Sequence, residues 1–168
     1  SVSRGLGDVY KRQGISAESG IRTFRAADGL WENHRIEDVA TPDAWKRNPE
    51  LVWSFYQQRR RQLLEVEPNS GHHALVDLES YLDHFLLVTQ NVDDVHERAG
   101  SSNLIHMHGE LAPLRCEACG HVEVMMDDSH LGENLLTCKK CEARMRPHIV
   151  WFGEMPMQMP EIEKALAE

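Results

Sequence analysis

Cys116-Glu-Ala-Cys119 and Cys138-Lys-Lys-Cys141 hold the four cysteines of this chain, as two Cys-x-x-Cys pairs separated by residues 120–137. Two pairs at this spacing are typical of a site in which four thiolates surround one Zn²⁺ ion. Four thiolates saturate a tetrahedral ion, so the metal would be structural and would not take part in catalysis. A disulfide, an iron–sulfur cluster and redox pairs are the alternatives. The spacing predicts a small zinc-binding module.

The composition is that of a globular chain with an acidic balance. The 168 residues give room for one domain with a real core, or for part of a larger one. Hydrophobic residues make up 41% and charged residues 27%, both ordinary values, and the formal net charge is −9. Nonspecific binding to nucleic acid needs many Lys and Arg side chains against phosphates, so we expect no nucleic-acid partner. A lysine-bearing protein substrate is compatible with the charge.

The sequence carries no membrane signal. No apolar run approaches the roughly 18 residues that a membrane-spanning helix needs, and no apolar segment follows the charged N-terminus as in a signal peptide. Cysteines that serve as metal ligands also favour a reducing compartment. We therefore expect a cytoplasmic protein without a membrane partner, and we favour a monomer.

The hydrophobic pattern alternates between helices and short buried strands. Leu51, Val52, Phe55 and Leu63 recur at three- and four-residue steps, which predicts a helix over 49–66. Further helices are expected after Ser16, after a cap at Ser70, over Val95–Ala99 and over 161–168, whereas 26–41 is expected to be mostly irregular around an anchoring Trp31. Continuous apolar runs predict buried strands at Phe85–Thr89, Leu104–Met107 and His148–Phe152. This order indicates an α/β layered sheet.

Two polar segments lie where such a sheet could bind a ligand. Gly14, Ser16 and Gly20 would let backbone N–H groups approach a phosphate at a helix start, although a plain helix cap and turn is the favoured interpretation when this segment is taken alone. Thr89-Gln-Asn-Val-Asp93 follows a predicted strand at its carboxyl end, where open α/β sheets bind ligands. An Asx-type turn is the alternative there.

Two further pairs could carry chemistry. His106 and His108 would face the same side of a strand, and His108 precedes a glycine at the strand end, where its pKa near neutrality suits a general base. Tyr56 and Arg59 share one helix face, and an Arg fork beside a hydroxyl can bind a carboxylate. Without further context, Arg59, Arg60 and Arg61 would read as a solvated run of charge.

The ordered set of motifs resembles the sirtuins, a family of NAD-dependent protein deacylases. The resemblance rests on Gly14-Ile-Ser-Ala-Glu-Ser-Gly-Ile-Arg-Thr-Phe-Arg25, Thr89-Gln-Asn-Val-Asp93, His106-Met-His-Gly-Glu110, the two cysteine pairs and Arg146-Pro-His-Ile-Val-Trp-Phe-Gly-Glu154. It extends over residues 14–168. Phe-Tyr56-x-x-Arg59 further resembles the bacterial and mitochondrial branch that removes succinyl and malonyl groups, in which Tyr and Arg hold the acyl carboxylate.

The resemblance implies a function and a role for each motif. NAD and acyl-lysine proteins would react to give nicotinamide, free lysine and 2′-O-acyl-ADP-ribose, with one structural Zn²⁺ in the protein. His108 would be the general base, and Phe24 would shield the ribose carbon. The residues implied to bind NAD are Gly14, Ile15, Ser16, Ala17, Thr23, Phe24, Arg25, Gln90, Asn91 and Asp93. Those implied to bind substrate are Tyr56, Arg59, Val150, Trp151, Phe152, Gly153 and Glu154, the last five by pairing with the peptide as an added strand.

The expected fold is α/β, a Rossmann-type parallel sheet with an inserted small zinc-binding module, and it is incomplete in this chain. Residues 14–110 would form the NAD-binding portion with a helical insertion at about 30–70, residues 111–145 the zinc module, and residues 146–168 a truncated return to the first part. Residues 1–13 are expected to be a non-native leader, because they read like one frame of a sequencing adapter. We expect the first strand of the family and part of its phosphate loop to be missing or foreign here and its later nucleotide-binding segments to lie beyond residue 168, and therefore weak or no activity.

Two other functions fit parts of the sequence. A zinc-ribbon binding module without catalysis would explain the cysteines alone, although the ordered catalytic-type motifs weigh against it. An ADP-ribosyltransferase of the same fold would use the same nucleotide-binding residues. Release of nicotinamide that depends on an acyl-lysine peptide would distinguish a deacylase from both.

Overall fold

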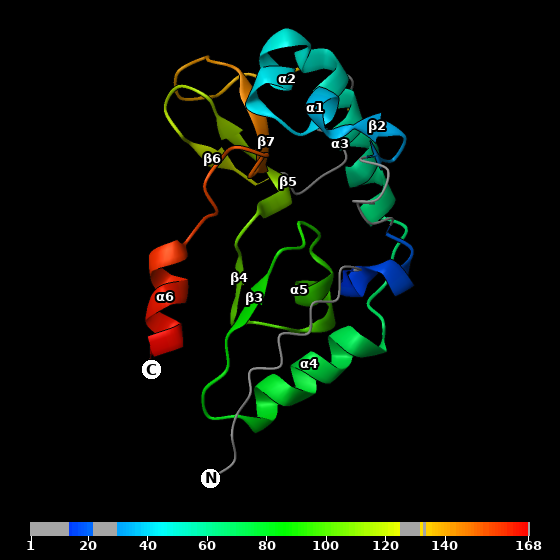
Figure 1. Ribbon diagram of the computed structural model, residues 1–168, viewed down its shortest axis with the longest axis vertical. Coiled ribbons are helices and arrows are strands. Elements are labelled where there is room, and N and C mark those ends of the chain that lie inside the picture. Colours follow the sequence, from blue (N-terminus) through cyan, green and yellow to red (C-terminus); the bar gives the residue numbers. More distant parts are fainter. Residues whose placement is uncertain (1–13, 22–29, 125–131, 133, 168) are drawn as a thin grey trace.

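A computed structural model describes residues 14–21, 30–124, 132 and 134–167 of the chain (Figure 1). The elements run in the order η1 (Ile15–Ser19, a 3₁₀ helix), β1 (Leu30–Trp31), β2 (His34–Arg35), α1 (Ile36–Val39), α2 (Pro42–Arg47), α3 (Pro49–Leu63), α4 (Ser70–Tyr81), β3 (Leu87–Thr89), α5 (Val95–Ala99), β4 (Leu104–His106), β5 (Gly109–Cys116), β6 (Val122–Glu123), β7 (Met145–Ile149) and α6 (Met159–Ala167). The predicted helix starts at 16, 49, 70 and 95 are confirmed to within a residue.

Three helices, α1 to α3, stack at one end of the molecule (Figure 1). The side chains of Thr41 and Asn48 accept hydrogen bonds from the backbone of α2 and α3, and each helix then begins with a proline, which needs no N–H partner there. The apolar face of α3 buries Trp53, Phe55 and Tyr56 almost completely. The prediction that 26–41 is mostly irregular is wrong in its described part, since Leu30–Val39 forms a hairpin and α1.

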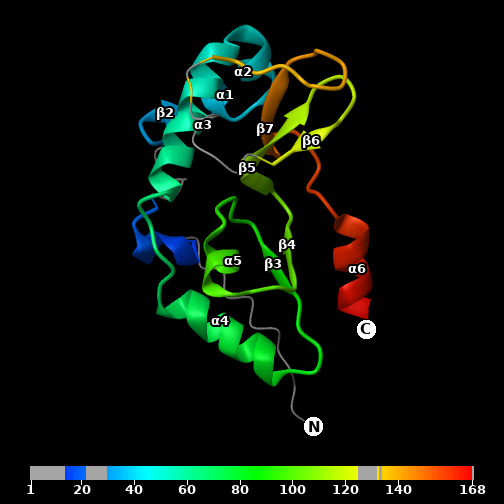
Figure 2. The same cartoon turned by 180° about the vertical axis from the view of Figure 1, so that it is seen from behind.

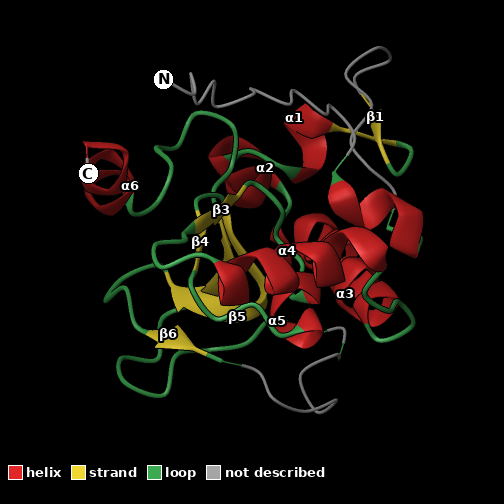
Figure 3. Ribbon diagram, turned by 90° about the horizontal axis from the view of Figure 1, so that it is seen from below, coloured by secondary structure: helices red, strands yellow, loops and turns green. Residues whose placement is uncertain are grey.

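The parallel pair β3 and β4 forms a two-stranded sheet in the described residues. Leu87, Val88 and Thr89 pair with Leu104, Ile105 and His106, and α5 lies in the connection between them. Figure 3 shows β3, β4 and β5 close together, with α3, α4 and α5 on one side. The parallel strands are confirmed, but the prediction of a fully buried strand is wrong at Val88, which is 36% exposed. The cap of α4 is Asn69 and not Ser70, since Asn69 accepts from the Gly71 backbone.

The second sheet is antiparallel, in the order β6–β5–β7. The prediction of a third buried strand at His148–Phe152 is wrong in its bounds and in its direction, because Met145–Ile149 pairs antiparallel with β5. The chain turns after Ile149, where the Trp151 backbone N–H donates to the Glu154 carboxylate. Gly109 begins β5 with a positive φ of 80°, and a Cβ there would stand 2.1 Å from the His148 carbonyl oxygen. Only glycine therefore allows the two strands to cross so closely.

The last helix, α6, lies to one side of both sheets in Figures 1 and 2. It confirms the amphipathic helix predicted near the C-terminus, and its buried residue is Ile162. None of the helices in the described residues combines the length and apolar surface needed to cross a membrane. The structure is a mixed α/β fold with a parallel strand pair and a cysteine-bearing antiparallel sheet.

Candidate functional site

The four cysteines meet at one point. Their Sγ atoms all lie within 4.8 Å of one another, with Cys116 to Cys141 at 3.4 Å and Cys119 to Cys138 at 3.7 Å. A tetrahedral Zn²⁺ with Zn–S bonds of about 2.3 Å spaces its sulfurs about 3.8 Å apart, whereas a disulfide bond is only about 2.05 Å long. The cysteines are free thiols, so the donor set fits one zinc ion and the disulfide alternative fails.

Backbone groups support this cluster. The Cys119 N–H points at the Cys116 sulfur at 3.5 Å and lowers the pKa of that thiol to about 6, which favours the thiolate that a metal needs. Between the first two cysteines, Glu117 accepts from the Trp45 indole at 2.6 Å and from Arg144 at 2.7 Å. The cysteine cluster is therefore tied to α2 by a specific polar contact.

A second cluster forms around Ser16, a hub of buried polar groups. Ser16 Oγ donates to Asp93 Oδ1 at 3.0 Å, accepts from Asn91 Nδ2 at 3.1 Å and lies 3.3 Å from His72 Nε2. The Asn69 backbone N–H donates to His72 Nδ1, so a neutral His72 carries its hydrogen on Nε2 and donates to Ser16. η1, α4 and the loop after β3 thus meet at one hydroxyl.

Burial governs the charges of this polar hub. Asp93 is 5% exposed, and burial raises the pKa of its carboxyl group. Burial lowers the pKa of His72, which keeps that ring neutral. A Cβ on Gly14 would lie 2.9 Å from Asn91 Oδ1, so the backbone at the start of η1 runs directly beside the hub. Ile15 and Ala17 belong to η1, whereas Gln90 is exposed next to Asn91.

His108 lies in the turn between β4 and β5. Only His106 belongs to β4, so the prediction that both histidines face one side of a strand is wrong: the strand ends before His108. Burial lowers the pKa of His108, against an opposing contact with the Gln90 backbone. The ring is therefore neutral near pH 7, as a general base must be. The His108 carbonyl accepts from the Val150 N–H at 2.9 Å, which joins this turn to the segment after β7.

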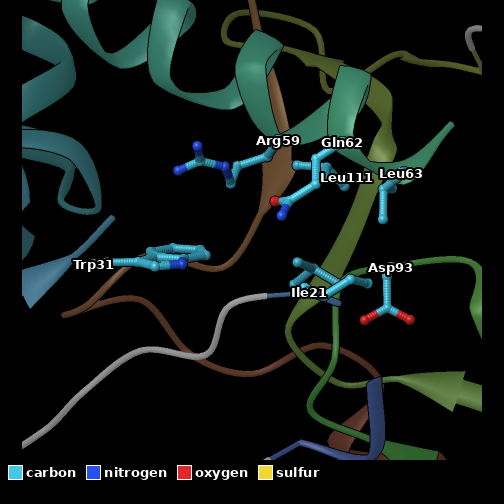
Figure 4. Close-up of a pocket in the computed structure, with 8 residues that line it drawn as sticks. Ile21, Trp31, Arg59, Gln62, Leu63, Asp93 and Leu111 are labelled. Atoms are coloured by element: carbon cyan, nitrogen blue, oxygen red, sulfur yellow. The ribbon is translucent and has the colours of Figure 1, made fainter. Parts of the chain in front are cut away.

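A pocket lies between α3, the segment after η1 and the loop after β3 (Figure 4). Its lining residues are Ile21, Trp31, Arg59, Gln62, Leu63, Val92, Asp93 and Leu111. Asp93 from the polar hub and Arg59 from the predicted acyl site therefore line one cavity. The Arg59 side chain is 13% exposed, and its guanidinium lies 4.0 Å from the Glu32 carboxylate and over the Phe55 ring at 4.8 Å.

Tyr56 is completely buried beneath the segment that follows β7. Its hydroxyl accepts from the Trp151 indole N–H at 3.0 Å, and burial raises its pKa. Trp151 also stacks against Arg146, which forms a two-pronged ion pair with Glu154 at 2.7 and 2.9 Å. Tyr56 and Arg59 lie on one helix, but Tyr56 faces Trp151 and Arg59 lines the pocket.

The segment Val150–Glu154 is a turn whose backbone is already well bonded. Four of its N–H groups donate within the chain: Val150 to His108, Trp151 to the Glu154 side chain, Phe152 to Ala40, and Glu154 to Trp151. Phe152 is 57% exposed. Thr23, Phe24 and Arg25, three of the predicted NAD-binding residues, lie outside the described residues.

The Sir2 family model matches residues 13–168 of the chain. The chain belongs to the Sir2 family. It is 59% identical over 162 residues to the NAD-dependent protein deacylase of Escherichia coli (strain K12), covering 95% of this chain and 58% of that protein. It is 58% identical over 163 residues to the protein of that name from Yersinia pseudotuberculosis serotype I, again covering 95% and 58%. The chain thus spans about 58% of the length of these curated relatives.

Solved structures show the same Sir2 fold. A Sir2 homologue in complex with NAD superposes with a TM-score of 0.77 at 43% identity, over 89% of this chain and 57% of that one. A mutant Sir2 homologue bound to 2′-O-acetyl ADP ribose gives a TM-score of 0.77 at 42% identity, over 90% and 59%. The predicted family and fold are therefore confirmed.

Sequence reasoning missed several residues of this Sir2 site. His72 completes the polar hub from α4, and Glu97 bonds His106. Trp151 was predicted to bind substrate, but its bond to Tyr56 was not foreseen. His72 is one of ten histidines, and its helix predicts only an amphipathic surface. The pair Asn69 and His72, at the spacing of a capping box, was the one signal that marked it.

Proposed function

We propose that the whole protein to which this chain belongs removes acyl groups from protein lysines with NAD as co-substrate. One water is consumed, and the products would be nicotinamide, free lysine and 2′-O-acyl-ADP-ribose. The observation that carries the proposal is that Asp93 of the polar hub and Arg59 of the predicted acyl site line the same cavity. The Sir2 relatives named NAD-dependent protein deacylases support it.

NAD supplies a ribose carbon that can accept the acyl oxygen and release nicotinamide. Asn91 and Asp93 would orient that ribose from the polar hub, and Gln90, which is exposed beside them, would bond the second ribose. Gly14, Ile15, Ser16 and Ala17 would supply backbone N–H groups at the start of η1, together with Thr23, Phe24 and Arg25. His108 would remove a proton from a ribose hydroxyl, since its ring is neutral near pH 7.

The acyl preference would be set by Arg59 and Tyr56. The Arg59 guanidinium lies in the pocket and already faces a carboxylate, that of Glu32, at 4.0 Å. A succinyl or malonyl carboxylate could replace Glu32 as its partner. The Tyr56 hydroxyl oxygen accepts a hydrogen bond from Trp151, so the hydroxyl hydrogen remains available for a second bond. Tyr56 would donate that hydrogen to the same acyl carboxylate when the acyl group extends to the buried ring. Acetyl-lysine would also be a substrate, without that ion pair.

The peptide would lie along the exposed edge of Val150–Glu154. Four N–H groups of this segment already donate within the chain, so the pairing would depend on its carbonyl groups and on the Gly153 N–H. The zinc ion would hold residues 111–145 as a module between residues 14–110, the NAD-binding portion, and residues 146–168. This chain alone would have weak activity or none. The whole protein would act as a cytoplasmic monomer.

Nicotinamide release from NAD tests the proposal. We expect the whole protein to release nicotinamide only when an acetyl-, succinyl- or malonyl-lysine peptide is present, with 2′-O-acyl-ADP-ribose detected by mass spectrometry. Transfer of labelled ADP-ribose to protein without deacylation would favour a transferase. No NAD consumption with any acyl peptide, from a folded and zinc-loaded protein, would leave only a zinc-dependent binding function.

A further inference from the structure

His106 lies at the end of β4 with acceptors on both sides of its ring. Nδ1 lies 2.9 Å from the backbone carbonyl oxygen of Asn91, and Nε2 lies 2.7 Å from the Glu97 carboxylate. The side chain is 8% exposed, whereas that of Glu97 is 37% exposed. This ring is distinct from His108, which the proposed function uses as the base.

The two contacts determine the charge of the ring. A backbone carbonyl and an ionised carboxylate can only accept hydrogen bonds, and a neutral imidazole carries a hydrogen on one nitrogen alone. A neutral His106 would therefore direct a lone pair at an oxygen on one side. Both contacts are satisfied together only when both nitrogens carry hydrogen, which makes the ring a cation.

The charged groups around the ring favour the cation. Burial opposes the charge on His106, but the bonds to Glu97 and the Asn91 carbonyl, and the carboxylate of Glu110, raise its pKa above the usual value. Burial would raise the pKa of Glu97, yet the bond to His106 lowers it overall. Asp93 in the loop and His96 on α5 also face this charge, but burial is the larger effect on both: it raises the pKa of Asp93 and lowers that of His96 to about 4.

The acceptor that His106 holds belongs to the loop of the polar hub. The Asn91 N–H donates to Thr89 Oγ1 at 3.0 Å, its side chain donates to Ser16, and its carbonyl accepts from His106. The rest of the loop is tied by the Leu111 N–H, which donates to the Val92 carbonyl at 2.7 Å. Among the described residues, His106 thus provides the one hydrogen bond to the Asn91 carbonyl. That bond forms only when Nδ1 of His106 carries a hydrogen.

We infer that His106 is a positioning residue, a buried imidazolium held by Glu97 that fixes the Asn91 backbone for NAD binding. The identity of the ligand as NAD rests on the proposed function. The charge of the ring and its hydrogen bond to the Asn91 carbonyl do not depend on that function. When His106 loses its proton at high pH, one of its two bonds becomes a repulsion between a lone pair and an oxygen. The remaining hydrogen stays on Nε2, against the stronger, charged acceptor, so the Asn91 carbonyl loses its donor and NAD binds more weakly.

The same three side chains, Glu97, His106 and Glu110, have the composition of a metal site, and their ligand atoms lie within 4.8 Å of one another. A metal would need an unprotonated ring nitrogen, whereas each nitrogen of His106 lies 2.7 to 2.9 Å from an acceptor, the distance of a hydrogen bond from a protonated nitrogen. The geometry therefore points to an ion pair and not to a second metal centre.

The test follows the ring nitrogens of His106 by NMR through a pH titration of the whole zinc-loaded protein, with NAD affinity measured by calorimetry over the same range. We expect both nitrogens to stay protonated above pH 6.5, the usual His pKa. The NAD Kd should rise about tenfold as the ring deprotonates, the effect of about one lost hydrogen bond.

The variant Glu97→Gln removes the need for a charged His106 ring while it keeps a side chain of similar size at position 97. The Gln amide can donate to a bare Nε2, so a neutral His106 can keep its bond to Asn91. We expect its pKa to fall in this variant and the pH step in NAD affinity to disappear. Asp94→Asn is the matched control, since Asp94 pairs with Arg98 at 3.2 Å and should leave both readouts unchanged. His106→Ala should bind NAD about tenfold more weakly at every pH.

The inference is overturned if His106 titrates at or below pH 6.5. It is also overturned if NAD affinity depends on pH in the same way in the wild type and in Glu97→Gln. A divalent metal that binds at His106 and displaces its proton would overturn it as well. A wild type that binds no NAD at any pH would contradict the proposed function instead. The Asn91 carbonyl shift would then decide the positioning role, because it must move with the His106 titration and cease to move in Glu97→Gln.

Discussion

The cysteine cluster and the polar hub around Ser16 each consist of four side chains, but these side chains come together in different ways. Within each Cys-x-x-Cys pair the ligands belong to a single turn, and backbone amides of the same turns point at their sulfurs. Ser16 instead bonds residues 56 and 77 positions away along the chain. The first site can form wherever its two turns meet, whereas the second exists only when η1, α4 and the loop after β3 are all in place.

The largest effect should follow loss of one zinc ligand. We expect Cys116→Ser to release the zinc ion and unfold residues around the cluster, because binding of a structural zinc contributes about 10 kcal/mol or more. Zinc content by elemental analysis and protection of 111–145 from proteolysis measure this. Ala118→Ser, at an exposed position in the same turn, should keep both. A folded, zinc-free Cys116→Ser protein with full activity would show that the cluster is not structural.

The second largest effect should follow removal of His108, the proposed general base. We expect His108→Ala to lower kcat by about 10²- to 10⁴-fold in the whole protein while the melting temperature and zinc content stay unchanged. The wild-type rate should rise with pH through a pKa below 6.5, because burial lowers the pKa of His108. His73→Ala, on the exposed face of α4, should have wild-type kinetics. Unaltered turnover in His108→Ala would exclude its role as base.

Arg59→Met separates the acyl end of the pocket from the hub end. We expect kcat/KM for succinyl- and malonyl-lysine peptides to fall about 100-fold, as when one partner of a buried charge pair is removed. Acetyl-lysine kinetics should stay within about twofold, because that substrate carries no charge for Arg59 to bind. Arg61→Met, at an exposed position of the same helix, is the control. An equal loss on all acyl groups would make Arg59 a structural residue.

The smallest effect concerns Glu32, which faces Arg59 at 4.0 Å. We expect Glu32→Gln to lower KM for the succinyl peptide by a few-fold, because a competing negative charge is removed from the partner of the substrate carboxylate. KM for the acetyl peptide should not change. Glu37→Gln, which removes an exposed partner of Arg35, controls for net charge. An increase in the succinyl KM would show that Glu32 orients Arg59 rather than competing for it.

The sequence predicted the parts of the fold that depend on local pattern. The spacing of apolar residues predicted α3, and the resemblance to the sirtuins implied that Ser16, Asn91 and Asp93 all bind NAD. The strand expected at His148–Phe152 failed for a physical reason. An apolar run shows that a segment is buried but not how its backbone bonds, and here the Arg146–Glu154 ion pair turns the chain where the run suggested continuation.

By itself, the sequence determined the zinc-type cluster and the family, because ligand spacing and ordered motifs are properties of the chain alone. Only the tertiary structure decided which groups face each other. It showed that Tyr56 bonds Trp151, that His72 completes the hub, and that His106 lies between two acceptors. The same side chain can be base, cation or core filler, and its protonation depends on the burial and hydrogen-bond partners that folding supplies.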